Sequence, residues 1–162
     1  MSSFRIVEAL NIVEHIGLGL IPGSVQARGI SPYGFVKSRN YKFTAVKWVS
    51  SRLFELRSEW DDFDPICKGC ISKGRSLSRR SEFGEIYWMA TYMREHKNFP
   101  QPIVMLDNRD DHLKKEYPAA WRVPAAFILV EGHMRFNIRA YLQTIGGLNP
   151  TVDVWLMEKS SH

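Results

Sequence analysis

One junction constrains the fold of this chain more than any other feature. Residues 127–130 are a fully apolar run (Phe-Ile-Leu-Val), which is typical of a short buried strand. The run continues without a spacer into Glu131-Gly132-His133-Met134-Arg135, called the 131–135 turn below. From residue 132 to 145 apolar side chains then recur at helical spacing, at Met134, Ile138, Tyr141 and Ile145. The sequence therefore predicts a buried strand that leads directly into a helix.

The residue types of this turn suit the binding of an anion. The first N–H groups of a helix have no partner within the helix, and with the helix dipole they favour phosphate. Gly132 allows a tight turn and a close approach by a ligand, and Arg135 can add a bidentate contact. Glu131 is the best candidate for a general base or metal ligand, with His133 as the second titratable group.

Each of these residues also has a plain structural interpretation. Gly132 can be a turn glycine and nothing more, and His133 can be a helix-start residue without a role in proton transfer. Glu131 can simply form an ion pair with Arg135. The sequence leaves both interpretations open.

The rest of the C-terminal half, residues 81–162, alternates helix and strand patterns. Its predicted order is a helix over 81–96 capped by Ser81, a strand at 102–106, a polar segment over 107–125, the strand and helix around the turn, and a strand at 152–156. These elements predict an α+β fold, a small mixed sheet with helices, preceded by a helical N-terminal extension.

Residues 1–80 form a basic region that we expect to pack with residues 81–162 as one compact domain. We predict helices over 3–16 and 42–60, the second from Val46, Val49, Leu53, Leu56 and Trp60, and loops over 22–40 and 65–80. The first helix pattern includes acidic residues and no cleavage site follows it, so we expect a cytoplasmic protein that has no membrane-spanning segment.

The positive charge is concentrated in the N-terminal region. Residues 1–100 carry 15 basic and 10 acidic side chains, whereas residues 101–162 carry seven of each. Basic side chains interleaved with aromatic ones suit a nucleic acid, through phosphate neutralisation and base stacking. The candidate contacts are Arg28, Lys37, Arg39, Lys42, Lys47, Arg75, Arg79 and Arg80, and the alternative is an ordinary basic surface.

Two other motifs contain groups that can take part in chemistry. Cys67 and Cys70 form a CxxC motif, which is interpreted as plain reduced thiols, as half a metal site completed by His96 or His112, or as a redox pair. Asp107 opens a polar run that ends at His112, and its oxygen ligands suit magnesium.

Two ordered motifs give the chain a resemblance to the ParB/sulfiredoxin superfamily over residues 83–157. In that family a helix leads to a segment ending Gln-Pro-Ile and an apolar strand, and the next strand ends in a Gly-x-x-Arg box that opens a helix. Here Gln101-Pro102-Ile103 and Gly132-His133-Met134-Arg135 stand in those places. The 131–135 turn, Glu-Gly-His-Met-Arg, resembles the Asp-Gly-His-x-Arg form that many ParB-like proteins have.

The resemblance implies a nucleotide, ATP or CTP, often with Mg²⁺. It implies that Gly132, His133 and Arg135 hold the phosphates, and that Gln101, Pro102 and Ile103 lie along the nucleotide. His133 stands where sulfiredoxins carry their catalytic cysteine, so sulfinic acid reduction is not expected.

We therefore expect a nucleotide-binding protein that hydrolyses or transfers phosphoryl groups, a nucleoside triphosphatase or phosphotransferase, with DNA cleavage by a nuclease as a further activity of this class. Glu131, His133 and Arg135 are the expected catalytic residues, with Glu131 and Asp107 as candidate metal ligands. The alternative is a non-catalytic effector of the kind found on plasmids and phages, which binds DNA or a protein partner.

Overall fold

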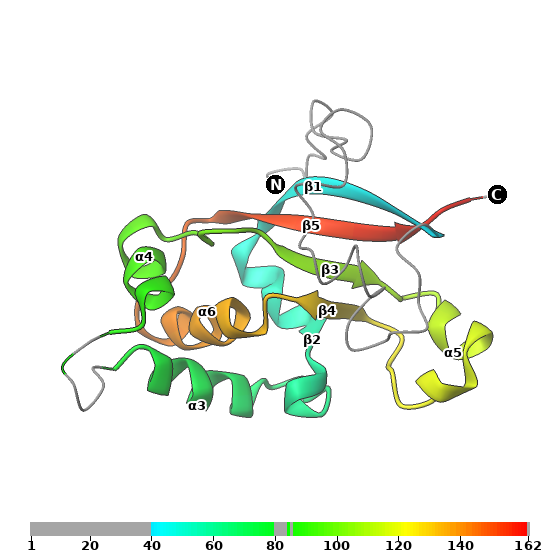
Figure 1. Ribbon diagram of the computed structural model, residues 1–162, viewed down its shortest axis with the longest axis horizontal. Helices are drawn as coiled ribbons and strands as arrows, with labels where there is room; N and C mark the ends of the chain where they lie inside the picture. The colour runs from blue at the N-terminus through cyan, green and yellow to red at the C-terminus, as the bar shows by residue number, and fades with distance from the viewer. Residues whose placement is uncertain (1–39, 80–83, 85, 162) are drawn as a thin grey trace.

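A five-stranded mixed sheet organises the fold of this protein in its computed structural model (Figure 1). The structure describes residues 40–79, 84 and 86–161. The strands are β1 (Tyr41–Val49), β2 (Leu56–Arg57), β3 (Ile103–Asp107), β4 (Phe127–Glu131) and β5 (Thr151–Lys159), and they lie in the order β1-β5-β3-β4-β2. The α+β class with a small mixed sheet is therefore confirmed.

Strands from the N-terminal region form both edges of this sheet. β1 pairs with β5 in antiparallel fashion, and β2 pairs with β4 in parallel fashion. Between them β3 pairs in parallel with β5 and antiparallel with β4. Residues 41–57 and 103–159 thus share one sheet.

The predicted helix over 42–60 is wrong. Residues 41–49 are strand β1, followed by two short 3-10 helices, η4 (Ser50–Glu55) and η5 (Glu59–Asp61), on either side of β2. Tyr41 and Phe43 lie in one core cluster and Val46 and Trp48 in the other, so the two pairs point to opposite faces of the sheet. The apolar residues at steps of three and four that suggested a helix belong to four separate elements: β1, η4, β2 and η5.

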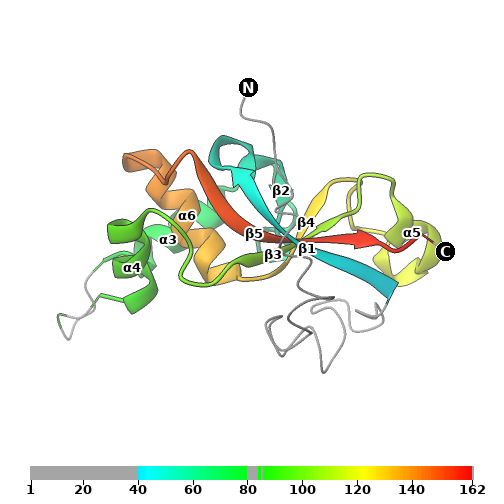
Figure 2. The ribbon, with the colours of Figure 1, turned by 90° about the horizontal axis from the view of Figure 1, so that it is seen from above.

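Helices cover both faces of the sheet. α3 (Lys68–Leu77), α4 (Trp88–His96) and α6 (His133–Ile145) lie together at one end, and α5 (His112–Glu116) lies at the other (Figures 1 and 2). Ile103 and Met105 pack in the cluster that includes α4 and α6, whereas Val104 and Leu106 pack in the cluster that includes Leu113 of α5. The α5 segment continues through the 3-10 helix η6 (Pro118–Ala120).

The predicted loop over residues 65–80 is also wrong, because α3 occupies most of it. The buried face of this segment is made of small residues: Cys67, Cys70, Gly74 and Ser78 are buried, at helical steps of three and four. A Cβ atom on Gly74 would lie 1.9 Å from the main-chain oxygen of Asn137 in α6. The small residues therefore permit two helices to pack closely and do not mark a loop.

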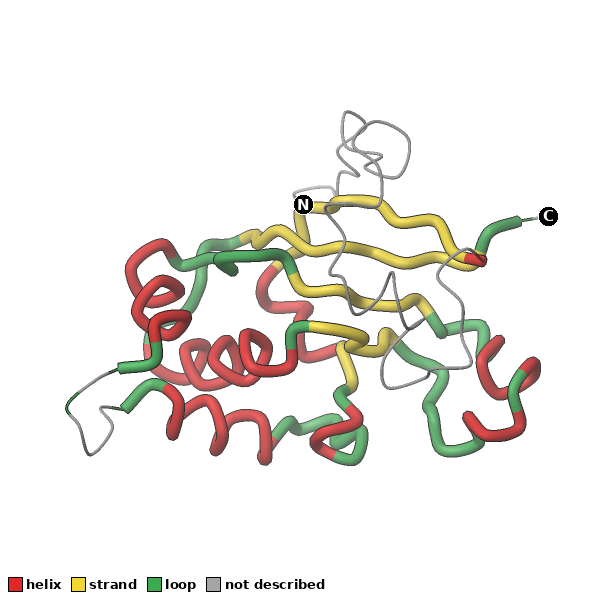
Figure 3. The backbone as a smooth tube through the Cα atoms, in the orientation of Figure 1, coloured by secondary structure: helices red, strands yellow, loops and turns green. Residues whose placement is uncertain are grey.

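The predicted order of the C-terminal half is confirmed. The structure has strand, strand, helix and strand in the expected places, as β3, β4, α6 and β5. Figure 3 shows the order of helices and strands along the backbone. α4 ends at His96 as predicted but begins at Trp88, and Ser81 lies outside the described residues. The polar segment over 107–125 includes the short helices α5 and η6.

The predicted helix over 3–16 lies outside the described residues, as does the predicted loop over 22–40 except for residue 40. Among the helices that the structure describes, none has the length and apolar character needed to cross a membrane.

Candidate functional site

The 131–135 turn has the predicted strand-to-helix geometry. β4 ends at Glu131, Gly132 adopts a φ of 95°, and α6 begins at His133. No side chain caps the start of α6, and its first main-chain bond runs from Phe136 N to Gly132 O at 2.8 Å. The N–H groups of residues 133–135 therefore have no carbonyl partner within the helix.

Gly132 is required by space as well as by conformation. A Cβ atom at this position would lie 2.6 Å from Cγ2 of Ile103 and 3.0 Å from Nη2 of Arg135. Ile103 belongs to the Gln-Pro-Ile motif, so the two motifs that carry the family resemblance meet at this point. From the resemblance, we expected the Gln-Pro-Ile motif and the 131–135 turn to lie along the same ligand.

Arg135 is fixed by two partners at the edge of the site. Its Nη1 donates to the main-chain oxygen of Gln101 at 2.9 Å, and its Nη2 donates to Oε2 of Glu131. The Arg135 side chain is 5% exposed and that of Glu131 28% exposed. The plain interpretation of Glu131, an ion pair with Arg135, is thus what the structure contains.

His133 is held by an aromatic neighbour that the sequence did not predict. Its imidazole stacks on the indole of Trp60 in η5, with 4.4 Å between ring centroids. The Nε2 atom is buried and has no hydrogen-bond partner among the described residues. Burial lowers the pKa of His133 to about 4, so the ring is neutral near pH 7.

A cavity of about 210 Å³ adjoins the turn. Trp60 and Met89 line it together with residues 131–135. Pockets for whole small-molecule ligands commonly span about 300–1,000 Å³, so this cavity suits a phosphate group or part of a nucleotide. Gln101 accepts a hydrogen bond from Arg135, and Ile103 lies against Gly132, with Pro102 between them in the chain. The lining of the cavity does not include these three residues.

Sequence reasoning missed Trp60 because it assigned the residue to the apolar stripe of a helix. Trp60 is 62% exposed, which is unusual for so large an apolar side chain. Its position directly before the acidic run Asp61-Asp62 was a signal that the apolar pattern had already ended.

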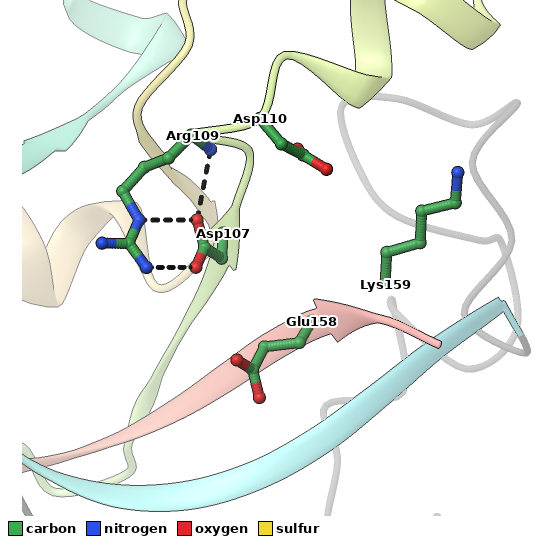
Figure 4. A pocket seen from close by; sticks show the side chains of 5 residues that line it. All are labelled: Asp107, Arg109, Asp110, Glu158 and Lys159. Atoms are coloured by element: carbon green, nitrogen blue, oxygen red, sulfur yellow. Dashed lines mark hydrogen bonds and ion pairs between the residues drawn. The ribbon is translucent and has the colours of Figure 1, made fainter. Parts of the chain in front are cut away.

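The two candidate metal ligands do not come together. In the antiparallel pair of β3 and β4, Glu131 lies opposite Val104 and Asp107 opposite Phe127, so the carboxylates lie at opposite ends of the pair. Asp107 instead accepts two side-chain hydrogen bonds from Arg109, at 2.9 and 2.6 Å, beside a cavity of about 450 Å³ (Figure 4). Asp110, Glu158 and Lys159 complete the lining of that cavity.

A metal site at the cysteines lacks further ligands. Within the described part of the chain, no three His, Cys, Asp or Glu side chains form a group that could hold a metal ion. His96 stacks on Tyr92, and His112 bonds to Tyr41 and Asp110.

The candidate nucleic-acid contacts are dispersed where the structure describes them. Lys42 and Lys47 lie on edge strand β1, five residues apart, so they point to opposite faces of the sheet, and Lys47 pairs with Asp153. Arg75 and Arg79 are exposed on or next to α3, which lies away from β1 (Figure 1). Arg28, Lys37, Arg39 and Arg80 lie outside the described residues.

Comparison with protein-family models, curated proteins and solved structures found no match for this chain. The ParB/sulfiredoxin resemblance therefore remains a prediction from two motifs.

Proposed function

We propose that this protein binds the phosphates of a nucleotide, ATP or CTP, at the 131–135 turn. The observation that carries the proposal is the start of α6, where uncapped N–H groups adjoin a cavity and no described residue offers a partner to the buried Nε2 of His133. Backbone amides and a neutral imidazole N–H are hydrogen-bond donors that suit phosphate oxygens. The resemblance to ParB-like proteins points to the same ligand.

Trp60 gives the site an apolar surface next to these donors. Its exposed indole lines the cavity and can stack on a nucleobase or ribose, as aromatic side chains do in many nucleotide sites. A phosphate at the turn and a base against Trp60 would place the two parts of a nucleotide on chemically matched surfaces.

Arg135 takes part only if it exchanges partners. Its guanidinium is already bonded to Glu131 and Gln101, so a phosphate would have to replace the Glu131 carboxylate. Among the described residues that line the cavity, Glu131 alone is acidic, and it would then be the residue that holds a Mg²⁺ ion carried by the phosphates. The same carboxylate, once released, is the candidate base for phosphoryl hydrolysis or transfer.

The first experiment is thermal unfolding of the purified full chain with a panel of nucleotides, with and without Mg²⁺. A ligand that binds only the folded state must raise the melting temperature. Trp60→Ala should lower the stabilisation by the best nucleotide, whereas Trp121→Ala, another exposed tryptophan at 68% exposure, should leave it unchanged. If no nucleotide stabilises the wild-type protein, the proposed function is wrong.

Turnover is a second measurement, with Glu131→Gln and Arg135→Ala beside the wild-type protein. Loss of hydrolysis in both variants would support the catalytic assignment of these residues, and equal turnover in all three proteins would remove it.

A non-catalytic effector is the second candidate function, because Glu131 is engaged with Arg135. Nucleotide binding without turnover would favour it. A salt titration of DNA binding would then test the basic side chains, since each phosphate contact steepens the dependence on salt.

A further inference from the structure

The CxxC motif opens helix α3 and faces a buried arginine. Cys67 is the residue before the helix and Cys70 lies in its first turn, where Ile71 N donates to Cys67 O at 2.9 Å. Helix geometry places Cα atoms three residues apart at about 5 Å, which lies within the range of disulfides. Neither cysteine is in a disulfide, and both side chains are almost fully buried. In its protonated form the Cys67 thiol donates to the main-chain oxygen of Asp64 at 3.7 Å, a contact that the thiolate gives up.

The guanidinium of Arg139 in α6 is buried without an acidic partner in the described part of the chain. Arg139 is fully buried, its Nη1 donates to Gln143, and its Nε and Nη2 have no hydrogen-bond partner there. Phe54 and Phe136 lie against the group, at 5.0 and 4.0 Å from its carbon to the ring centroids. A buried cation of this kind is costly unless an anion lies near it.

The two thiols are the groups able to become anions that act on this charge in the described part of the chain, and they lie in the same core cluster as Phe136. Burial lowers the pKa of Arg139 to about 10, and electrostatic attraction to Cys67 and Cys70 opposes that effect. A hydrogen bond from Cys70 is the largest cause that lowers the pKa of Cys67, to about 7, and burial opposes it. Arg139 and Arg57 also lower this pKa, whereas Asp61 raises it. The hydrogen bond shared with Cys67, together with burial, raises the pKa of Cys70.

We propose that Cys67 and Cys70 form a reversible disulfide, and that Arg139 holds Cys67 as the reactive thiolate. The oxidant is a small uncharged peroxide, because the buried thiols exclude bulky disulfides. The Cys67 thiolate attacks one peroxide oxygen and the O–O bond breaks, which gives a sulfenic acid while the second oxygen leaves as hydroxide. The Cys70 thiol then attacks the Cys67 sulfur, and the hydroxyl group leaves as water with the Cys70 proton.

The proposal separates Cys67 and Cys70 by role. Cys67 is the residue that reacts with peroxide, and Cys70 is the residue that resolves the sulfenic acid. Oxidation removes the anion beside Arg139, so the arrangement stabilises the reduced form and makes the disulfide easy to reduce.

The test uses the folded full chain treated with hydrogen peroxide and analysed by intact mass. The wild-type protein should lose the mass of two hydrogens, and dithiothreitol should restore it. Cys70→Ser should accumulate a sulfenic acid on Cys67 that dimedone traps, whereas Cys67→Ser should gain neither modification. Free thiols after treatment, or sulfinic acid at Cys67 without a disulfide, would contradict the proposal that Cys67 and Cys70 form a reversible disulfide.

The rate at which peroxide oxidises Cys67 tests the role of Arg139. Loss of the charge in Arg139→Met should slow oxidation roughly fivefold near pH 7, because a rise of the Cys67 pKa from about 7 by about one unit lowers the thiolate fraction from roughly one half to roughly one tenth. Arg139→Lys keeps a cation and should react at a rate closer to that of wild type. Equal rates in all three proteins would contradict the role of Arg139.

A measurement on the unaltered protein covers the case in which Arg139→Met fails to fold. The oxidation rate of wild-type protein should reach its plateau below about pH 8.5, where an ordinary cysteine is half ionised. A rate that still rises about fivefold between pH 7.5 and 8.5, as the thiolate fraction of an ordinary cysteine does, would overturn the proposed thiolate.

Discussion

The imidazole of His133 lies nearly parallel to the indole of Trp60, at an interplanar angle of 19°. The contact joins the first residue of α6 to η5, a segment more than seventy residues earlier in the chain. It buries the histidine ring beside the cavity and leaves Nε2 without a partner among the described residues. Burial and neutrality of His133 have consequences that can be measured.

The stability of the fold should decline in mild acid because of His133. The folded-state pKa of His133, about 4, lies below its ordinary value of 6.5. Its contribution to stability is therefore complete above about pH 6.5 and is lost as the pH falls towards 4, up to roughly 3 kcal/mol. Urea unfolding of wild type and His133→Gln across this range measures the difference, and parallel pH profiles would contradict the prediction.

Gly132→Ala should destabilise the protein more than a positive φ alone explains. The strained backbone costs about 1–2 kcal/mol for an alanine, and the close contact with Ile103 should add about 1–3 kcal/mol. Gly147→Ala is the matched control, because Gly147 has a φ of 86° and open space around a Cβ. Equal losses of unfolding free energy in the two variants would mean that the contact with Ile103 relaxes freely.

The Glu131–Arg135 pair should respond asymmetrically to the loss of either partner. Glu131→Ala leaves a buried guanidinium with only Gln101 beside it, and we expect a loss of roughly 2–4 kcal/mol. Arg135→Met leaves a carboxylate that is partly exposed and can be hydrated, so it should cost less. Chemical denaturation of both single variants and the double variant gives the coupling energy, which should be zero if the pair contributes nothing.

The contact between α3 and α6 should depend on Gly74. An alanine Cβ there would meet a backbone oxygen of Asn137, which cannot rotate away. Gly74→Ala should therefore lower the free energy of unfolding by about 3 kcal/mol or more. Gly69→Ala is the control on the same helix, since its Cβ would meet only the side chain of Asp61, which can move. Thermal unfolding measures both, and a mild effect at Gly74 would show that the helices can separate slightly.

The sequence by itself determined the elements around the turn. An apolar run of four residues, a glycine and a helical repeat leave few alternatives, so β4, Gly132 and α6 could be placed before the structure was known. Local patterns are sufficient there because each element has the single pattern expected of its class. The same holds for β3 and β5.

Tertiary packing decided what local patterns could not show. β1 is buried on both faces and α3 carries the small residues that α6 requires, so one resembled a helix and the other a loop. The stacking of Trp60 on His133 joins segments about seventy residues apart, and the contact of Gly74 with Asn137 joins segments more than sixty residues apart. Sequence spacing carries no information about such contacts, because they depend on how the sheet and helices pack.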